Sequence, residues 1–246
     1  MDDLLVSRGI ARDRDHAQRL LLAGRVRVGE GDGARTDRKP GELVDSETPT
    51  TAIEKPRFVS RGGEKLDAAL EAFGISVAGR VCLDAGASTG GFTDVLLRRG
   101  AARVYALDVG RGQLAEVLRR DPRVVSMERT HAARLDPSST DPVTLPEPVS
   151  LAVIDVSFIS LTRVMAGVKG TLSAEGEIVA LVKPQFEAGP SQTPRGVVRD
   201  PAVQEATVDR VVAHAAGLGL AVRGRMESPL LGPKGNREFL IHLSLA

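Results

Sequence analysis

The chain has 246 residues, of which 42% are apolar and 26% charged, enough for one large globular domain and a small one. With a net charge of +1, the whole protein does not carry the strong positive potential that is typical of many nucleic-acid-binding proteins, so any basic surface must be local. No apolar run approaches the roughly 18 residues of a membrane-spanning helix, and the acidic start MDDLLVSRGI is not a signal peptide. The single cysteine, Cys82, cannot form an internal disulfide, and we expect a buried thiol in a cytoplasmic protein.

Residues 1–55 predict a small α+β domain. Two amphipathic helical patterns, DDLLVSRGI and RDRDHAQRLLLAGRV, stop at Gly9 and Gly24, and the alternating strand RVRVGE follows. Residues 29–42 are expected to form a loop, and GELVDSETPTTAI a turn with a short strand. Residues 56–59 are the predicted linker, because Pro56 restrains the backbone of the residue before it.

Strand and helix patterns alternate over residues 60–246. A helix is expected over SRGGEKLDAALEAFGI, then the strands VCLDAG, RVYALDV, VVSM, LAVIDVSF and IVALVKP with helices between most of them. One intervening helix is expected over 112–120 and a long one over 201–219. This alternation predicts an α/β fold, a parallel sheet flanked by helices on both faces. Only a loop separates the last two strands, LAVRGRM and EFLIHLSL, which predicts a terminal antiparallel addition.

The glycine-rich segment LDAGASTGGF, residues 83–92, connects the first of these strands to a helix and is a candidate cofactor loop. Its spacing is not that of G-x-G-x-x-G or of a P-loop, which disfavours a dinucleotide or a nucleoside triphosphate. Asp108 ends the second strand, 24 residues after Asp84, where a carboxylate can accept both hydroxyls of a ribose. The alternative is a cap for the helix over 112–120. A ribose site without a phosphate-binding lysine favours S-adenosylmethionine.

Four charged residues close short motifs at or near strand ends. They are Lys65 in RGGEKL, Asp155 in AVIDVSF, Lys183 in LVKPQF and Glu238 in GNREFL. Ligands of open α/β sheets bind at the carboxyl ends of the strands, where a lysine beside a carboxylate can activate a hydroxyl. Taken singly, each residue has a simpler interpretation as a solvated charge. For Lys65 the simpler interpretation is a salt bridge with Glu64 on the same helix. Together they predict group transfer to a hydroxyl.

A ribose hydroxyl is too weak an acid to lose its proton unaided. A lysine can accept that proton only when it is neutral, a state that burial or a neighbouring lysine favours. We therefore expect Lys65 to lie near Lys183, with Asp155 and Glu238 orienting the pair.

Several strings together resemble the TlyA/hemolysin A family over nearly the whole chain: SRGGEKL, LDAGASTGGFTDVLL, DVGRGQL, DVSFISL, LVKPQFEAG, GVVRDP and GPKGNREFL. The resemblance implies a Rossmann-like, FtsJ-like methyltransferase domain behind an N-terminal RNA-binding module of ribosomal-protein type. It implies 2′-O-methylation of a cytidine ribose in ribosomal RNA, with Lys65, Asp155, Lys183 and Glu238 as the catalytic tetrad. The candidate residues for S-adenosylmethionine are Asp84, Gly86, Ser88, Gly90, Gly91, Phe92, Asp108 and Glu128.

Three positions depart from the family pattern. Arg111 stands where members usually have an aromatic residue, His131 where they have Asn, and Phe58 where many have Trp. Arg111 and His131 are expected near the cofactor or substrate rim, so they signal either altered specificity or neutral drift. The chain also resembles the shorter members, which implies the large ribosomal subunit as the only target.

Arginines gather near the N-terminus within 20 residues, and the candidates for RNA binding are Arg8, Arg12, Arg14, Arg19, Arg25 and Arg27. Arginine suits bidentate contact with phosphate, although a solvated charged face is the alternative. Aromatic residues make up only 3% of the chain, which argues against a base-stacking platform. RNA recognised through its shape and backbone is the better expectation.

Two other functions stay open. One is a small-molecule methyltransferase or another S-adenosylmethionine-dependent biosynthetic enzyme on the same scaffold, against which the arginine-rich segment argues. The other is a non-catalytic RNA-binding protein, against which the four motif residues argue. The four histidines are scattered without ligand spacing, so no metal site is expected.

Overall fold

The computed structural model describes residues 1–31, 34–53 and 56–246. The chain divides into two compact units, Met1–Pro56 and Arg57–Ala246, each described here by itself. The division, between Pro56 and Arg57, falls within the predicted linker, residues 56–59. In the described part of the chain, no helix is both long and apolar enough to cross a membrane.

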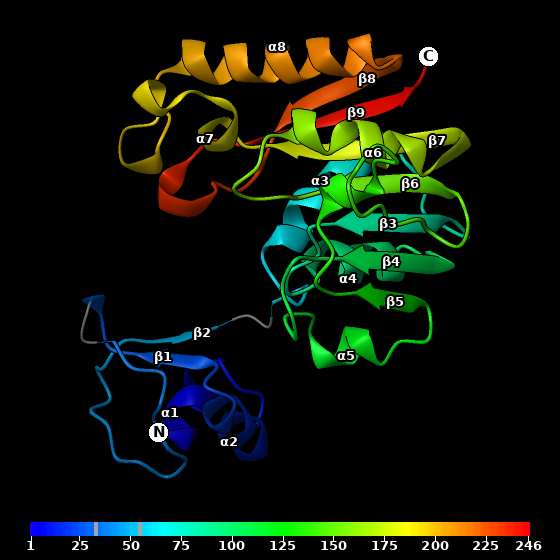
Figure 1. The fold of residues 1–246 in the computed structure, drawn as a ribbon. Coiled ribbons are helices and arrows are strands. Elements are labelled where there is room, and N and C mark those ends of the chain that lie inside the picture. Colours follow the sequence, from blue (N-terminus) through cyan, green and yellow to red (C-terminus); the bar gives the residue numbers. More distant parts are fainter. Residues whose placement is uncertain (32–33, 54–55) are drawn as a thin grey trace. The chain divides into compact units, whose positions relative to one another are not determined.

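The first unit contains two helices and a two-stranded antiparallel sheet (Figure 1). Its elements are α1 (Asp2–Ser7), α2 (Arg14–Leu22), β1 (Val26–Val28) and β2 (Thr50–Ala52). Asp13 begins α2 as its cap, because the carboxylate accepts the backbone N–H of His16 at 2.6 Å. Leu5, Ala17, Leu20 and Val26 form a small buried core of its own, as the predicted amphipathic patterns require.

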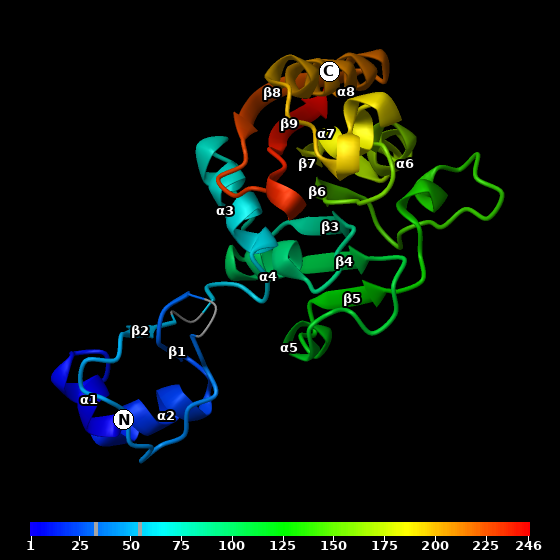
Figure 2. The same ribbon diagram turned by 90° about the vertical axis from the view of Figure 1, so that its left-hand side faces the viewer.

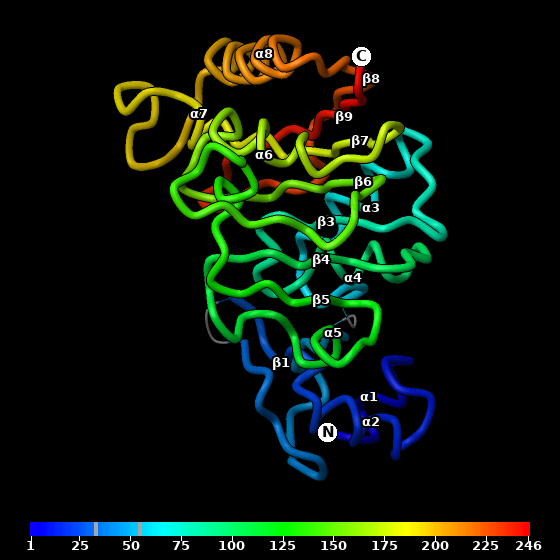
Figure 3. Tube along the Cα trace, turned by 45° about the vertical axis from the view of Figure 1, so that its right-hand side comes forward, coloured from blue at the N-terminus to red at the C-terminus, as the bar shows by residue number. Residues whose placement is uncertain are grey.

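The second unit is a seven-stranded sheet in the order β5-β4-β3-β6-β7-β9-β8 (Figures 1 and 3). Its strands are β3 (Val81–Ala85), β4 (Arg103–Leu107), β5 (Val124–Met127), β6 (Val149–Ile154), β7 (Leu172–Val182), β8 (Leu220–Glu227) and β9 (Phe239–Leu245). Strands β3 to β7 pair in parallel. β9 enters antiparallel between β7 and β8, which confirms the predicted antiparallel addition.

Helices cover both faces of this sheet (Figure 2). They are α3 (Gly62–Ala72), α4 (Gly91–Arg98), α5 (Glu116–Arg119), α6 (Met165–Gly170), α7 (Pro184–Glu187) and α8 (Pro201–Gly217). Short 3-10 turns, η2 (Ala132–Leu135), η3 (Leu161–Arg163), η4 (Pro190–Gln192), η5 (Pro194–Gly196) and η6 (Pro233–Gly235), occupy the connections. Two buried apolar clusters result, one containing Leu83 and Ile154 and the other containing Leu66 and Cys82. Burial in β3 raises the pKa of the Cys82 thiol to about 12, as suits the structural thiol expected there.

One predicted helix is shorter than expected. Of residues 112–120 only Glu116–Arg119 are helical. Gly112 has φ of +65°, outside the range of a right-handed helix, and the N–H of Ala115 donates to the carbonyl of Thr89 at 3.1 Å. The first part of the segment is therefore an extension of the cofactor loop, and Leu114 from it packs beside Gly90.

Candidate active site

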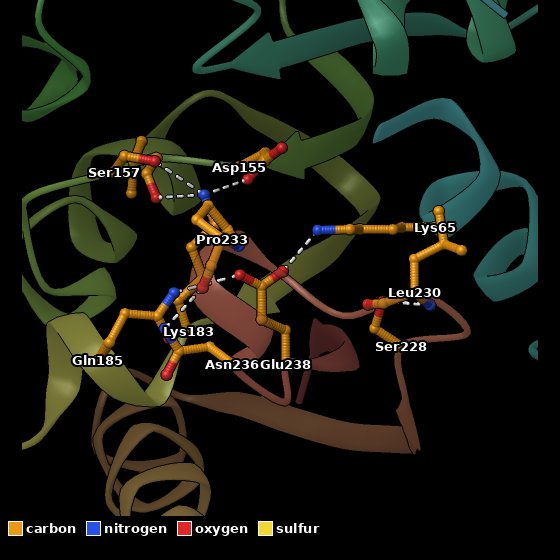
Figure 4. A network of polar contacts seen from close by, with 11 residues as sticks. Lys65, Asp155, Ser157, Lys183, Gln185, Ser228, Leu230, Pro233, Asn236 and Glu238 are labelled. Carbon is orange, nitrogen blue, oxygen red and sulfur yellow. Dashed lines mark hydrogen bonds and ion pairs between the residues drawn. The ribbon is translucent and has the colours of Figure 1, made fainter. Parts of the chain in front are cut away.

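The four motif residues meet at the carboxyl ends of the parallel strands as two lysine–carboxylate pairs (Figure 4). Nζ of Lys65, on α3, lies 2.6 Å from Oε2 of Glu238, which directly precedes β9. Nζ of Lys183, after β7, lies 2.6 Å from Oδ1 of Asp155, after β6. All four side chains line one cavity of about 480 Å³. The expected gathering of these residues at one edge is what the fold produces.

The pairing differs from the arrangement expected for a lysine base. Each lysine has a carboxylate as its nearest charged partner, and a carboxylate favours the charged ammonium. The ammonium of Lys183 also donates to the carbonyl of Val156 at 3.1 Å and to Oγ of Ser157 at 2.9 Å. Together with the contact to Asp155, these bonds hold the ammonium at the residues that follow β6.

Burial favours the protonated form of the Asp155 carboxyl group. Desolvation raises its pKa above the ordinary value of 3.8, although the neighbouring Lys183 and Lys65 oppose the shift. Glu238 is completely buried and takes a second hydrogen bond from Nε2 of Gln185 at 3.2 Å. Ser157 and Gln185 were not among the sequence candidates, although both lie inside the motifs DVSF and LVKPQF.

A second cavity of about 500 Å³ adjoins the first, and Gly86, Ser88 and Asp155 line both. Gly86 has φ of +95°, and a Cβ there would lie 2.6 Å from the carbonyl oxygen of Asp155. Only glycine lets the loop lie this close to the end of β6. Asp108, Gln113 and His131 line the second cavity but not the first.

Asp108 does not cap α5. Its two carboxylate oxygens accept the backbone N–H groups of Ser88, at 2.8 Å, and Gly110, at 2.7 Å. The carboxylate thus joins the loops after β3 and β4, and its remaining lone pairs can still accept hydroxyls. A carboxylate on the wall of a cavity, beside a loop pressed against the neighbouring strand, fits the ribose of a nucleoside cofactor.

The other cofactor candidates occupy different places. Gly91 and Phe92 line the first cavity, whereas Glu128 lines only a small hollow beside Asp108 and accepts the N–H of Gly112 at 2.9 Å. Gly90 lies under Leu114 and Leu118 and lines no cavity described here. Asp84 is fully buried below the loop, with Oδ2 accepting the Thr93 hydroxyl at 2.6 Å and Oδ1 without a partner among the described residues.

Burial raises the pKa of Asp84 to about 7, and the nearby Asp155 adds to the shift while the Thr93 hydroxyl opposes it. Between pH 4 and 7 the folded protein therefore holds a proton that the unfolded chain has released. This group's contribution to stability is complete below about pH 4 and is lost as the pH rises toward 7, by roughly a few kcal/mol.

Asp84→Asn should flatten this dependence in the protein without cofactor. The neutral amide keeps an acceptor for Thr93 and cannot ionise, so the variant should gain stability relative to the wild type at pH 8 more than at pH 5. Denaturant unfolding at the two pH values measures the difference. The same change at exposed Glu116, Glu116→Gln, serves as the control. Parallel pH profiles for the wild type and Asp84→Asn would contradict the assignment.

The positions that depart from the family pattern fall in three settings. His131 begins η2, where its Nδ1 accepts the N–H of Ala133 at 3.1 Å, and its ring lines the second cavity. Arg111 is exposed and lines none of the described cavities. Phe58 is buried, with the guanidinium carbons of Arg57 and Arg98 at 4.9 and 5.4 Å from its ring centroid.

The arginine candidates of the first unit divide into two groups. Arg8 donates to Oγ1 of Thr50 at 2.8 Å and to the carbonyls of Ser46 and Thr48, and Arg25 donates to the carbonyl of Ile53. These two brace the unit itself. Arg12, Arg14, Arg19 and Arg27 are exposed, and among the described residues Arg12 and Arg14 form ion pairs, with Asp13 and Asp3. Such exposed pairs are weak and leave the guanidinium available to a phosphate.

The sheet of parallel strands with antiparallel β9 inserted beside its edge strand, the glycine-rich loop after β3 and the carboxylate after β4 are the features of a Rossmann-like methyltransferase. Residues 58–245 match the family model of the FtsJ-like methyltransferases. The chain belongs to that family and, within it, to the TlyA group. It is 49% identical over 99% of its length to the 16S/23S rRNA (cytidine-2′-O)-methyltransferase TlyA of Mycobacterium tuberculosis, covering 88% of that protein.

Solved structures agree with this assignment. One of a hemolysin-named protein from Streptococcus thermophilus is 44% identical, with a TM-score of 0.74, over 100% of this chain and 87% of that one. An S-adenosylmethionine-dependent methyltransferase from Listeria monocytogenes, 16% identical with a TM-score of 0.55, covers 76% of this chain and 100% of its own and shares the fold.

Proposed function

We propose that this methyltransferase transfers a methyl group from S-adenosylmethionine to the 2′-hydroxyl of a cytidine ribose in ribosomal RNA. The observation that carries the proposal is the junction of two cavities at Gly86, Ser88 and Asp155, with the two lysine–carboxylate pairs on one side and Asp108 on the other. The relative in Mycobacterium tuberculosis, named for this reaction, supports the choice of substrate.

When bound, S-adenosylmethionine supplies an electrophilic methyl group. The second cavity would take its nucleoside part, with Asp108 accepting the ribose hydroxyls, and Gly86 would bring the reactive end to the junction. The first cavity would hold the acceptor ribose against Lys183. Positioning of the hydroxyl in line with the methyl group accounts for much of such a transfer.

The proton of the acceptor hydroxyl needs a destination, and Lys183 with Asp155 offers one. A charged Lys183 cannot accept a proton until it has passed one of its own to a neighbour. Oδ1 of Asp155 lies 2.6 Å from the Lys183 ammonium, and burial raises the pKa of this carboxyl group. The hydroxyl proton would thus move to Lys183 as a lysine proton moves to Asp155, while Lys65 and Glu238 hold the far wall.

The decisive experiment supplies labelled S-adenosylmethionine with separated small and large ribosomal subunits. Label should enter ribosomal RNA, and nuclease digestion with mass spectrometry should find 2′-O-methylcytidine. Restriction of the label to the large subunit would support the expectation drawn from the shorter family members. RNA without label, combined with cofactor binding, would favour the small-molecule alternative, and failure to bind the cofactor would favour the non-catalytic one.

Asp108→Ala should weaken S-adenosylmethionine binding by roughly 1.5–3 kcal/mol, the scale of hydrogen bonds to a charged group. Isothermal titration calorimetry measures the dissociation constant, with Glu116→Ala as a control that removes an exposed carboxylate from α5. Because Asp108 also holds Ser88 and Gly110, thermal unfolding without cofactor checks that the loops stay in place. An unchanged dissociation constant would leave Asp108 as a loop brace only.

A further inference from the structure

Two short turns at the edge of the sheet that carries the cavities repeat one pattern, proline–basic residue–glycine. They are Pro194–Gly196, between α7 and α8, and Pro233–Gly235, before β9. Their central residues have nearly the same left-handed backbone, φ 55° and ψ 24° for Arg195 and φ 57° and ψ 19° for Lys234. This conformation is unfavourable for residues with a Cβ, and it persists where the surroundings impose it, often at functional sites.

The surroundings here join the two turns into one bracket, which we define as residues 194–196 and 233–235. Nζ of Lys234 donates to the carbonyl of Arg195 at 3.1 Å. The buried side chain of Asn236 donates to the carbonyl of Gly196 at 3.0 Å and accepts the N–H of Val198 at 3.1 Å. A buried amide with its hydrogen bonds satisfied on both loops fixes their relative position.

The bracket presents positive charge that the protein does not neutralise. Arg195 and Lys234 are exposed, and neither has a carboxylate within ion-pair distance among the described residues. Nearby arginines behave differently, since Arg225 pairs with Glu205 and Asp209, and Arg237 pairs with Glu227. Cations on turns whose backbone is fixed are suited to an external anion, because the backbone loses little conformational freedom on binding.

The bracket also continues the wall of the first cavity. Gly232 and Pro233 line that cavity with Lys65 and Glu238, and the N–H of Gly232 donates to the carbonyl of Asn236 at 2.8 Å. Arg61, another exposed arginine without an ion pair in the described chain, lines the same cavity. The cations therefore lie beside the place where the acceptor ribose would enter.

From this geometry we infer that the bracket binds backbone phosphate of the RNA strand next to the acceptor nucleotide. The inference rests on the proposed function, because it names the contact by which the methyltransferase unit itself would hold its substrate. Phosphate contacts fix register without reading sequence. The bracket would thus place the ribose at Lys183 while other surfaces select the site.

The test removes both charges, Arg195→Ala with Lys234→Ala, in the full chain. Affinity for ribosomal RNA should fall on the order of tenfold or more, and the slope of log affinity against log salt should shrink by about 1–2. The matched control, Arg103→Ala with Arg223→Ala, removes two charges from β4 and β8 that do not line either cavity and should leave the salt slope nearly unchanged. S-adenosylmethionine binding should be the same in all three proteins.

Exchanging the two basic side chains, Arg195→Lys with Lys234→Arg, keeps both positive charges and should therefore retain most of the RNA affinity. If the original side chains acted only in holding the turns, the exchanged pair would not be expected to retain it. An unchanged salt slope in the double alanine variant, or an equal loss in the control, would overturn the inference. The inference would also be overturned if the double alanine variant lost binding of inorganic phosphate but kept its affinity for RNA. If the wild type fails to methylate RNA, the proposed function fails; loss of salt-dependent RNA affinity in the double variant would still support the bracket.

Discussion

Lys183→Ala is expected to lower methyl transfer by about 10²–10⁴-fold, the range for loss of a positioned acid–base group. The ammonium lies at the junction of the two cavities, held by Asp155, Val156 and Ser157, and no other described lysine shares those contacts. Single-turnover assays with saturating cofactor measure the step directly. The control is Lys169→Ala, because Lys169 lies at the end of α6 and donates to the carbonyl of Leu218, away from both cavities.

Cofactor binding should survive the same substitution. Asp108 and the loop from Gly86 to Ser88 remain in place, so calorimetry should give a nearly unchanged dissociation constant for S-adenosylmethionine. The lost cation leaves Asp155 without its partner, and we expect that carboxyl to take up a proton instead of unfolding the domain. Lys183→Ala combined with Asp155→Asn removes the lone charge and tests this point by thermal unfolding. Surviving turnover, or loss of the cofactor, would show that Lys183 has a different role.

Deleting residues 1–55 is expected to remove most activity on ribosomal RNA while leaving a folded domain that binds S-adenosylmethionine. The two units have separate buried cores, and the described residues that line the two cavities all belong to the second unit. The cut retains Arg57, whose guanidinium lies 2.5 Å from the carboxylate of Asp67 on α3. Circular dichroism and calorimetry check the truncated protein before its activity is compared.

Replacing Arg12, Arg14 and Arg19 together with alanine should reproduce much of that loss and reduce the salt dependence of RNA affinity. These side chains are exposed, whereas Arg8 and Arg25 are used inside the unit and would confound the result. The matched control removes Arg103, Arg120 and Arg223 from the second unit. A truncated protein that methylates RNA as well as the intact chain would show that residues 1–55 are not the RNA anchor. A full chain without salt-sensitive RNA binding would favour the small-molecule alternative.

Residues distant in the chain could be assigned to one site from the pattern alone, because the topology of a parallel sheet leaves little choice. An apolar run followed by Asp155, Lys183 or Asp108 marks a carboxyl end, and the carboxyl ends of the parallel strands fall on one edge of the sheet. The short glycine-rich loop and the antiparallel last strands follow from equally local signals. These features needed only the periodicity of strands and helices.

The hydrogen-bond and ion-pair partners of these residues could not be predicted from the sequence. Lys65 and Glu238 are 173 positions apart and bond because α3 packs beside the start of β9, so the expected lysine pair became two lysine–carboxylate pairs. Asp108, a possible helix cap by its position in the chain, instead accepts a hydrogen bond from Ser88 in the neighbouring loop. The helix expected over 112–120 is limited to Glu116–Arg119. Both differences arise because loop conformation depends on contacts with other loops. The amino-acid sequence by itself thus determined the sheet and which charged residues stand at its edge. The choice of partner for each charge was left to the tertiary structure, because ion pairs and hydrogen bonds depend on distances of a few ångströms that no local pattern encodes.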